Sequence, residues 1–171
     1  MTFKAEIRAS IGWNWSHGAQ DNNRLDYGRP LAEGPGGGQA EAVWHLDRQA
    51  LPNGLATVLD LTALKRDVLA AVLTTTFVRV KGLMLTCDAS STGRLVLGGA
   101  GNAEWSAPFG ADGDTLEVQP DGAVFLADRK DGWPVDDAHK LLMLAAAGGN
   151  VTYSLAVVGT LTATGSGSSG T

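Results

Sequence analysis

A chain of 171 residues with 44% hydrophobic and 18% charged residues fits one globular domain with a core of good size. Its 23 glycines are spread along the chain without a three-residue period, which excludes collagen and indicates many tight turns. The net charge of −5 argues against nucleic acid as a partner, because that binding depends on clustered Lys and Arg.

The single cysteine, Cys87, excludes a disulfide within the chain, and we expect it to be a small buried hydrophobe. No apolar stretch approaches the roughly 20 residues that a membrane-spanning helix needs, so no membrane partner is expected. The first residues, TFKAEIRAS, lack the hydrophobic core of a signal peptide. Together these features predict a protein that is made in a cytoplasm and not exported by the usual route.

The first predicted strand covers residues 2–15, where apolar and polar residues alternate with a period of two. Trp13 and Trp15 extend this pattern or cap the core. Residues 16–39 are polar and glycine-rich, end in EGPGGGQ and show no periodicity. A stretch of this length without structure is unusual in a compact domain. We therefore expect a functional loop, or an arm that lies on a neighbouring subunit.

The rest of the chain is dominated by short apolar runs bounded by Gly, Pro, Asn or Asp, which is typical of strands. They are expected at residues 40–47, 56–61, 77–87, 95–99, 114–118, 122–127, 141–146 and 151–159. Residues 62–75 change to a helical period and predict one short helix, with Asp60 or Thr62 as its N-cap. About nine strands at this spacing predict an all-β fold, an antiparallel β-sandwich with one helix. The domain should cover residues 1–161, followed by a flexible Ser/Gly-rich tail at 162–171.

The polar residues show no recognisable catalytic, cofactor-binding or metal-binding set. His17, His45, His139 and Cys87 lack the spacing of metal ligands. The acidic clusters Asp112–Asp114, Asp128–Asp131 and Asp136–Asp137 lie in turns, where aspartates are usually solvated. We therefore expect no enzyme, no cofactor and no metal site. A hydrolase on a sandwich scaffold stays open as an alternative, and would need paired carboxylates or a triad in one cleft.

Five tryptophans are many for a chain of this size, and such side chains either fill a core or anchor contacts between subunits. Trp44 is expected in the core. For Trp105 and Trp133, core and interface remain equal alternatives. The candidates for an interface are Trp13, Trp15, Tyr27, Trp105 and Trp133.

Five segments of the chain form a characteristic series. They are ATVLDLTAL (56–64), FVRVKGLMLT (77–86), LVLGGAGNAEW (95–105), VQPDGAVFLADRKDGWPV (118–135) and VTYSLAVVGT (151–160). Over residues 55–160 this order resembles that of small virion structural proteins of tailed bacteriophages, of the head decoration or cement type.

The resemblance implies a jelly-roll sandwich on the outer surface of the virion head, assembled in the bacterial cytoplasm. The implied partners are the major capsid protein and further copies of the chain, with a trimer favoured over a dimer. The alternative is a tail-fibre or carbohydrate-binding module that recognises host glycans. That function would need a planar row of exposed Trp or Tyr beside Asp and Asn.

Overall fold

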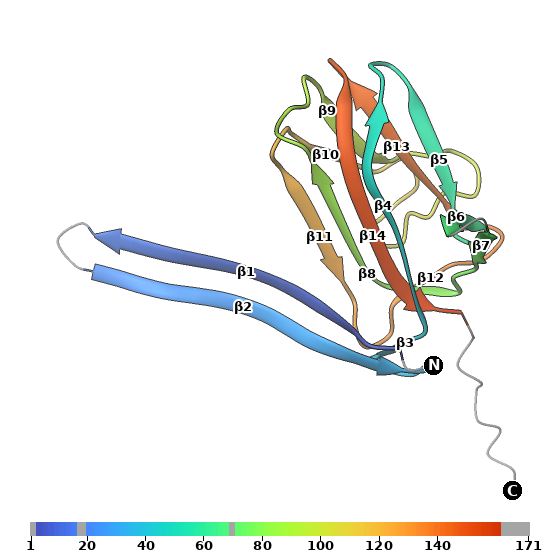
Figure 1. Cartoon of the computed structure of the whole chain (residues 1–171), viewed down its shortest axis with the longest axis horizontal. Helices are drawn as coiled ribbons and strands as arrows, with labels where there is room; N and C mark the ends of the chain where they lie inside the picture. Colours follow the sequence, from blue (N-terminus) through green and yellow to red (C-terminus); the bar gives the residue numbers. More distant parts are fainter. Residues whose placement is uncertain (1–2, 17–19, 69–70, 162–171) are drawn as a thin grey trace, which may run out of the picture.

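The computed structural model describes residues 3–16, 20–68 and 71–161, and the expected tail at 162–171 lies outside this range. The described chain forms a sandwich of antiparallel strands from which one long hairpin projects (Figure 1). The prediction of an antiparallel β-sandwich is therefore confirmed. None of the described segments is a helix long and apolar enough to cross a membrane.

Two four-stranded paths make the sandwich. Sheet I has the order β11-β8-β14-β4, and the short β12 also pairs with β8. Its strands are β4 (Ala42–Leu51), β8 (Arg79–Cys87), β11 (Ala123–Ala127), β12 (Trp133–Pro134) and β14 (Val151–Thr160). Sheet II has the order β10-β9-β13-β5. Its strands are β5 (Ala56–Asp60), β9 (Arg94–Gly98), β10 (Thr115–Val118) and β13 (Leu141–Ala147).

The core lies between the two sheets and follows from the period of two in their sequences. In β13, Leu142, Leu144 and Ala146 are buried, and the residues between them are half-buried. In β14 the inward residues are Val151, Tyr153, Leu155 and Val157, as their alternation predicts. Cys87 is buried in the same cluster, which confirms its expected role as a small hydrophobe.

The prediction of a helix over residues 62–75 is wrong. The described part of this segment forms a hairpin of β6 (Leu64–Val68) and β7 (Ala71–Thr75). Asp60 Oδ1 accepts hydrogen bonds from the Thr62 backbone N–H and hydroxyl, so the expected N-cap instead closes a tight turn. Tertiary contacts then favour the extended chain, because Leu64 is buried in the core and Trp44 Nε1 donates to the Lys65 carbonyl.

The segment expected to be an irregular loop, residues 16–39, is mostly a strand. β1 (Ala5–Ser16) and β2 (Gln20–Glu33) pair without a register shift from Ala5–Leu31 to Ser16–Gln20. A tight turn then leads to β3 (Gln39–Ala40), which pairs parallel with the end of β2. We call the β1–β2 hairpin the arm. Its twelve-residue first strand spans about 40 Å at roughly 3.4 Å per residue.

Candidate interaction surface: the hairpin arm

The arm has one apolar and one polar face, because side chains alternate along both of its strands. Directly paired residues share a face, so Ile7, Ala9, Ile11 and Trp13 lie with Arg29, Tyr27, Leu25 and Asn23 respectively. The opposite face carries Glu6, Arg8, Arg24 and Asp26. On that face Arg8 pairs with Glu6 at 2.8 Å and Arg24 with Asp26 at 2.6 Å. The charges of the polar face are thus matched within the arm.

The base of the arm packs its apolar face on the outer face of sheet I. Ile7 is buried, and its Cδ1 approaches Gly82 so closely that a Cβ at Gly82 would lie only 2.9 Å away. Tyr27 meets Phe125 edge to face with 6.0 Å between ring centroids. Ile7, Leu31 and Ala40 form the buried centre of this small second core. The absence of a side chain at Gly82 is what allows the arm to cross the sheet.

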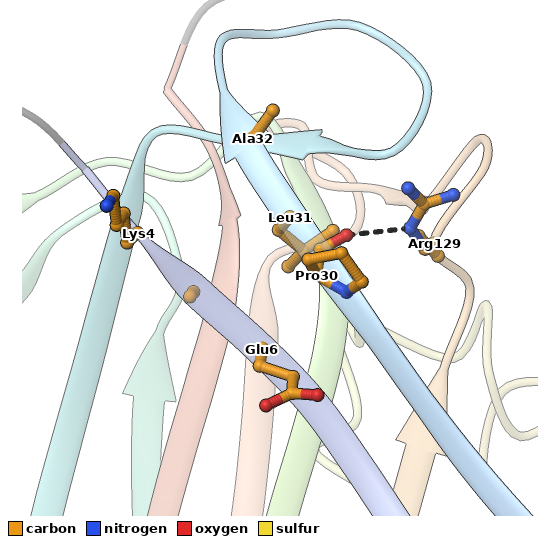
Figure 2. A pocket seen from close by; sticks show the side chains of 7 residues that line it. Lys4, Glu6, Pro30, Leu31, Ala32 and Arg129 are labelled. Carbon is orange, nitrogen blue, oxygen red and sulfur yellow. Dashed lines mark hydrogen bonds between the residues drawn. The ribbon is translucent and has the colours of Figure 1, made fainter.

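Polar contacts also fix the base of the arm to the loop after β11. Arg129 Nε donates to the Pro30 carbonyl at 3.0 Å (Figure 2), and the Gly38 N–H donates to the Arg129 carbonyl at 3.0 Å. Gly38 has a φ of +72°, and a Cβ there would lie 2.7 Å from the Arg129 guanidinium. The glycines of the EGPGGGQ segment therefore serve a close turn against Arg129.

Lys81 connects this loop to the core of the sandwich. Its side chain is 1% exposed, and its Nζ donates to the Lys130 carbonyl at 2.7 Å. Burial lowers the pKa of the Lys81 ammonium, and the carboxylate of Asp128 opposes that shift. Arg79 adds hydrogen bonds to the carbonyls of Asp131 and Gly132. A buried cation thus holds the loop that in turn holds the arm.

Beyond its base the arm leaves the sandwich, and its apolar face becomes exposed (Figure 1). Ile11 and Leu25 are directly paired across the hairpin and are 69% and 68% exposed. A hollow of about 350 Å³ lies where the arm departs from β11, lined by Ala9, Ile11, Leu25, Tyr27, Phe125 and neighbouring residues. An isolated two-stranded hairpin is marginally stable in water, so the outer half of the arm would gain from a partner.

The aromatic interface candidates occupy different environments. Trp105 is fully buried, and its Nε1 donates a hydrogen bond to the Pro134 carbonyl. Of the two predicted environments for Trp105, core or interface, the structure therefore shows the core. Trp133 is half-buried and packs edge to face against Trp105. Trp13 is 41% exposed on the arm, and Tyr27 is half-buried at the arm's base. Trp15 belongs to β1, but its side chain is outside the described part.

A second group of exposed apolar residues lies on the opposite side of the sandwich from the arm (Figure 1). Val72 and Leu73 of β7 are 61% and 55% exposed, and Val58 of β5 is 50% exposed. Val72 and Leu73 are neighbours in one strand, so their side chains point to opposite faces of the β6–β7 hairpin. We call this exposed apolar end of the hairpin the β7 patch. The predicted helix placed these two residues on its buried face. Their exposure became evident only when the structure showed a hairpin in place of that helix.

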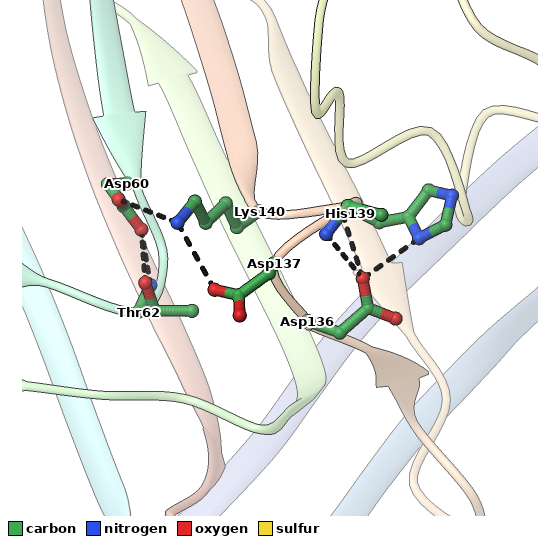
Figure 3. A network of polar contacts seen from close by, with 7 residues as sticks. Asp60, Thr62, Asp136, Asp137, His139 and Lys140 are labelled. Atoms are coloured by element: carbon green, nitrogen blue, oxygen red, sulfur yellow. Dashed lines mark hydrogen bonds and ion pairs between the residues drawn. The ribbon is translucent and has the colours of Figure 1, made fainter.

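The polar clusters near β13 form local networks (Figure 3). Asp136 Oδ1 accepts from the backbone N–H groups of Ala138 and His139 and contacts the His139 ring nitrogen at 3.0 Å. The pKa of Asp136 is lowered, mainly by the hydrogen bond with the His139 side chain. Lys140 lies between Asp137 at 3.4 Å and Asp60 at 3.8 Å. These groups stabilise turns at the surface.

The loop between β9 and β10 is organised by a buried carboxylate that the sequence pattern does not single out. Glu104 is 2% exposed and accepts hydrogen bonds from the backbone N–H groups of Gly99 and Gly113, at 2.6 and 2.9 Å. Asp112 accepts from the Ser106 hydroxyl, and Asp114 from the Ala111 N–H. Across residues 3–16, 20–68 and 71–161, no three His, Cys, Asp or Glu side chains are grouped to hold a metal ion.

The second strand of the arm and its apolar residues are not predicted from the sequence. A signal is present, because Leu25, Tyr27 and Leu31 alternate with polar or small residues. Gly28 and Pro30 obscure it, since both residues are disfavoured inside strands. Pro30 is tolerated because its carbonyl, and therefore its nitrogen, faces Arg129 and not β1.

The comparisons with known proteins add no relative. No family model matches the sequence, and no curated protein matches it. Function is therefore inferred from the arm, the sandwich and the β7 patch.

Proposed function

We propose that this chain is a non-enzymatic structural protein of a bacteriophage head, a decoration or cement protein that binds the major capsid protein and further copies of itself. The observation that carries the proposal is the pair of exposed apolar surfaces on opposite sides of a stiff sandwich, the outer arm and the β7 patch. A cement protein must contact two neighbours at once, and two separated surfaces permit that.

The strand order supports the jelly-roll class that the resemblance implies. Among the eight main strands of the sandwich, the first pairs with the last (β4 with β14) and the second with the seventh (β5 with β13). The third pairs with the sixth (β8 with β11) and the fourth with the fifth (β9 with β10). This nested pairing is that of one long hairpin rolled into two sheets, as in the jelly rolls of viral capsid proteins.

The energetics also favour assembly. A fully buried Ile, Leu or Val side chain contributes about 1.5–3 kcal/mol relative to an exposed one. Ile11, Leu25, Val72 and Leu73 are each more than half exposed. Covering them with neighbours in a particle would therefore supply several kcal/mol per copy. The isolated chain leaves this exposed part of the four side chains in water.

Head binding is tested by pelleting empty head shells, assembled from the major capsid protein of the same phage, with the purified protein. We expect the wild type to saturate the shells. Substitution of the β7 patch, Val72→Ser with Leu73→Ser, should weaken binding at least tenfold, which corresponds to about 1.4 kcal/mol. The control is Leu116→Ser, an exposed apolar residue of β10. Wild-type protein that stays in the supernatant would contradict the proposal.

The glycan-binding alternative keeps one observation in its favour. Trp13 is partly exposed and lies beside its cross-strand partner Asn23 near the end of the arm. Sugar platforms need several coplanar aromatic rings, whereas Tyr27 is turned against Phe125 and Arg29. A glycan array probed with the wild type and with Trp13→Ala distinguishes the two functions, because only the alternative predicts hits that depend on Trp13.

A further inference from the structure

We infer that the outer half of the arm binds the outer face of sheet I on a second copy of this chain. The inference rests on the proposed function and assigns to the arm the contact between copies, leaving the β7 patch for the capsid protein. Four observations lead to it: the contact within each chain, the groove beside it, the charges of the arm and the direction in which the arm leaves.

The first observation is that the arm and the outer face of sheet I already fit each other. Within one chain the arm buries Ile7 against Gly82, and Tyr27 against Phe125. The sheet contributes Phe125, Ala127 and Val158 around Gly82, and the arm adds Ile7 and Tyr27. The exposed Ile11 and Leu25 continue the same row of the arm beyond the edge of its own sheet.

The second observation is a groove on the same sheet face that the chain's own arm leaves partly open. It has a volume of about 260 Å³, and the sheet lines it with Val43, Gly82, Met84, Ala156 and Val158 among others. Val43 and Met84 are 41% and 46% exposed. The chain's own arm lines the other side of the groove with Ala5, Glu6, Ile7 and Arg8. A second arm on the open sheet residues would therefore extend the apolar contact of Ile7.

The third observation selects a second copy as the occupant. Residues 1–33 contain four basic and four acidic side chains, so the arm carries no net charge to attract a basic or acidic partner. The ion pairs Arg8–Glu6 and Arg24–Asp26 are satisfied on its polar face. Arg29 also lies on the apolar face, but at the base beside Tyr27. What remains for recognition on the outer half is therefore the apolar pair Ile11 and Leu25. The surface known to fit the row that this pair continues is the outer face of sheet I.

The fourth observation concerns geometry. The arm leaves the sandwich beside β11 and extends away from it, so its outer half can reach a neighbour and not its own groove (Figure 1). Donor and acceptor surfaces differ, so each copy gives one arm and receives another. Such head-to-tail contacts close into rings when the rotation between copies allows it, which agrees with a trimer.

Cross-linking between two different variants tests the contact. Ile11→Cys protein is mixed with Met84→Cys protein and treated with a short bismaleimide cross-linker. The native Cys87 is 3% exposed and should react little with the cross-linker. Wild-type protein measures the background of cross-linking through Cys87. We expect a cross-linked pair from this mixture, and none when Val58→Cys, on sheet II, replaces Met84→Cys. Equal yields from both mixtures, or no product from either, would overturn the inference.

Sedimentation gives an independent measurement. Wild-type protein should sediment as an oligomer, and Ile11→Ser with Leu25→Ser should reduce it to a monomer. The matched control, Arg24→Ser with Asp26→Ser, removes an ion pair on the polar face of the outer arm and should leave the oligomer intact. A wild type that is monomeric at its highest soluble concentration refutes the contact between copies. If that monomer still pellets with head shells, the binding to the capsid protein in the proposed function survives, and the contact between copies fails.

Discussion

Gly82 shows how one missing side chain sets the position of a whole element. In Gly82→Ala the new Cβ would lie 2.9 Å from Ile7 Cδ1 and 3.1 Å from Val158 Cγ1, so the base of the arm must shift. We expect a loss of about 1–3 kcal/mol, the usual cost of overpacking. Hydrogen exchange should increase in β1 and β2 and not in β13.

The matched test is the double variant Ile7→Ala with Gly82→Ala. Removing the branched side chain makes room for the new methyl group, so the two changes should cost less together than the sum of their separate effects. Additive losses in urea unfolding would show that Ile7 and Gly82 do not determine the position of the arm.

Asp88 provides a pH-dependent contribution at the start of the β8–β9 connection. Its pKa is lowered, first by the Ser90 hydroxyl and backbone N–H and then by Arg48 at 2.7 Å. A carboxyl whose pKa is lower in the folded state stabilises the fold above its unfolded value of 3.8, and the contribution is lost as the pH falls through the folded-state pKa.

We therefore expect Asp88→Asn to reduce the free energy of unfolding at neutral pH, and the difference from wild type to shrink below pH 3.8. Urea unfolding across a pH series measures this difference. A difference that grows toward acid pH would mean that the Asp88 charge is unfavourable in the folded state.

At the scale of the element, the outer arm and the sandwich are separable. Ser10 and Asp26 are directly paired, so residues 11–25 can be replaced by Asn-Gly, a two-residue turn that preserves the register. Ile7, Tyr27 and Leu31 remain, and with them the buried contact of the base. The unfolding temperature, followed by circular dichroism, should change by no more than a few degrees, because none of the described side chains among the removed residues belongs to the main core. A fall of more than about 10 °C would show that the outer arm supports the fold.

Single elements also show where prediction from the sequence succeeds and where it fails. The strands expected at 56–61, 95–99, 122–127 and 151–159 agree with the structure nearly to the residue, since each is a short apolar run closed by a turn. The β6–β7 hairpin is predicted as a helix, because Leu64, Val68 and Leu73 fit a helical face as well as a strand. Only the contact of Leu64 with the core, and of Trp44 with the Lys65 carbonyl, decides between them.

At the scale of the whole molecule, charge and apolar surface are separated. The arm has no net charge, so the chain's −5 is carried by the residues after position 33. Copies of an acidic sandwich repel one another at a distance, and salt at physiological strength screens that repulsion within about 8 Å. A neutral arm of about 40 Å is several times longer than this screening distance. Its outer apolar residues can therefore contact a neighbour while the two acidic sandwiches stay far enough apart for salt to screen their repulsion. This arrangement suits an assembly in which identical subunits stand side by side.

The sequence by itself determined the all-β class, most of the strands and the inward face of the core, because a period of two and the turns between strands are local properties. Tertiary structure alone decided which strands pair, that residues 20–33 are half of a hairpin and that Trp105 is buried. These features depend on contacts between residues far apart in the sequence, such as Ile7 with Gly82 and Arg129 with Pro30. For the same reason the exposed row of Ile11 and Leu25 became visible only once the arm was seen to leave the sandwich.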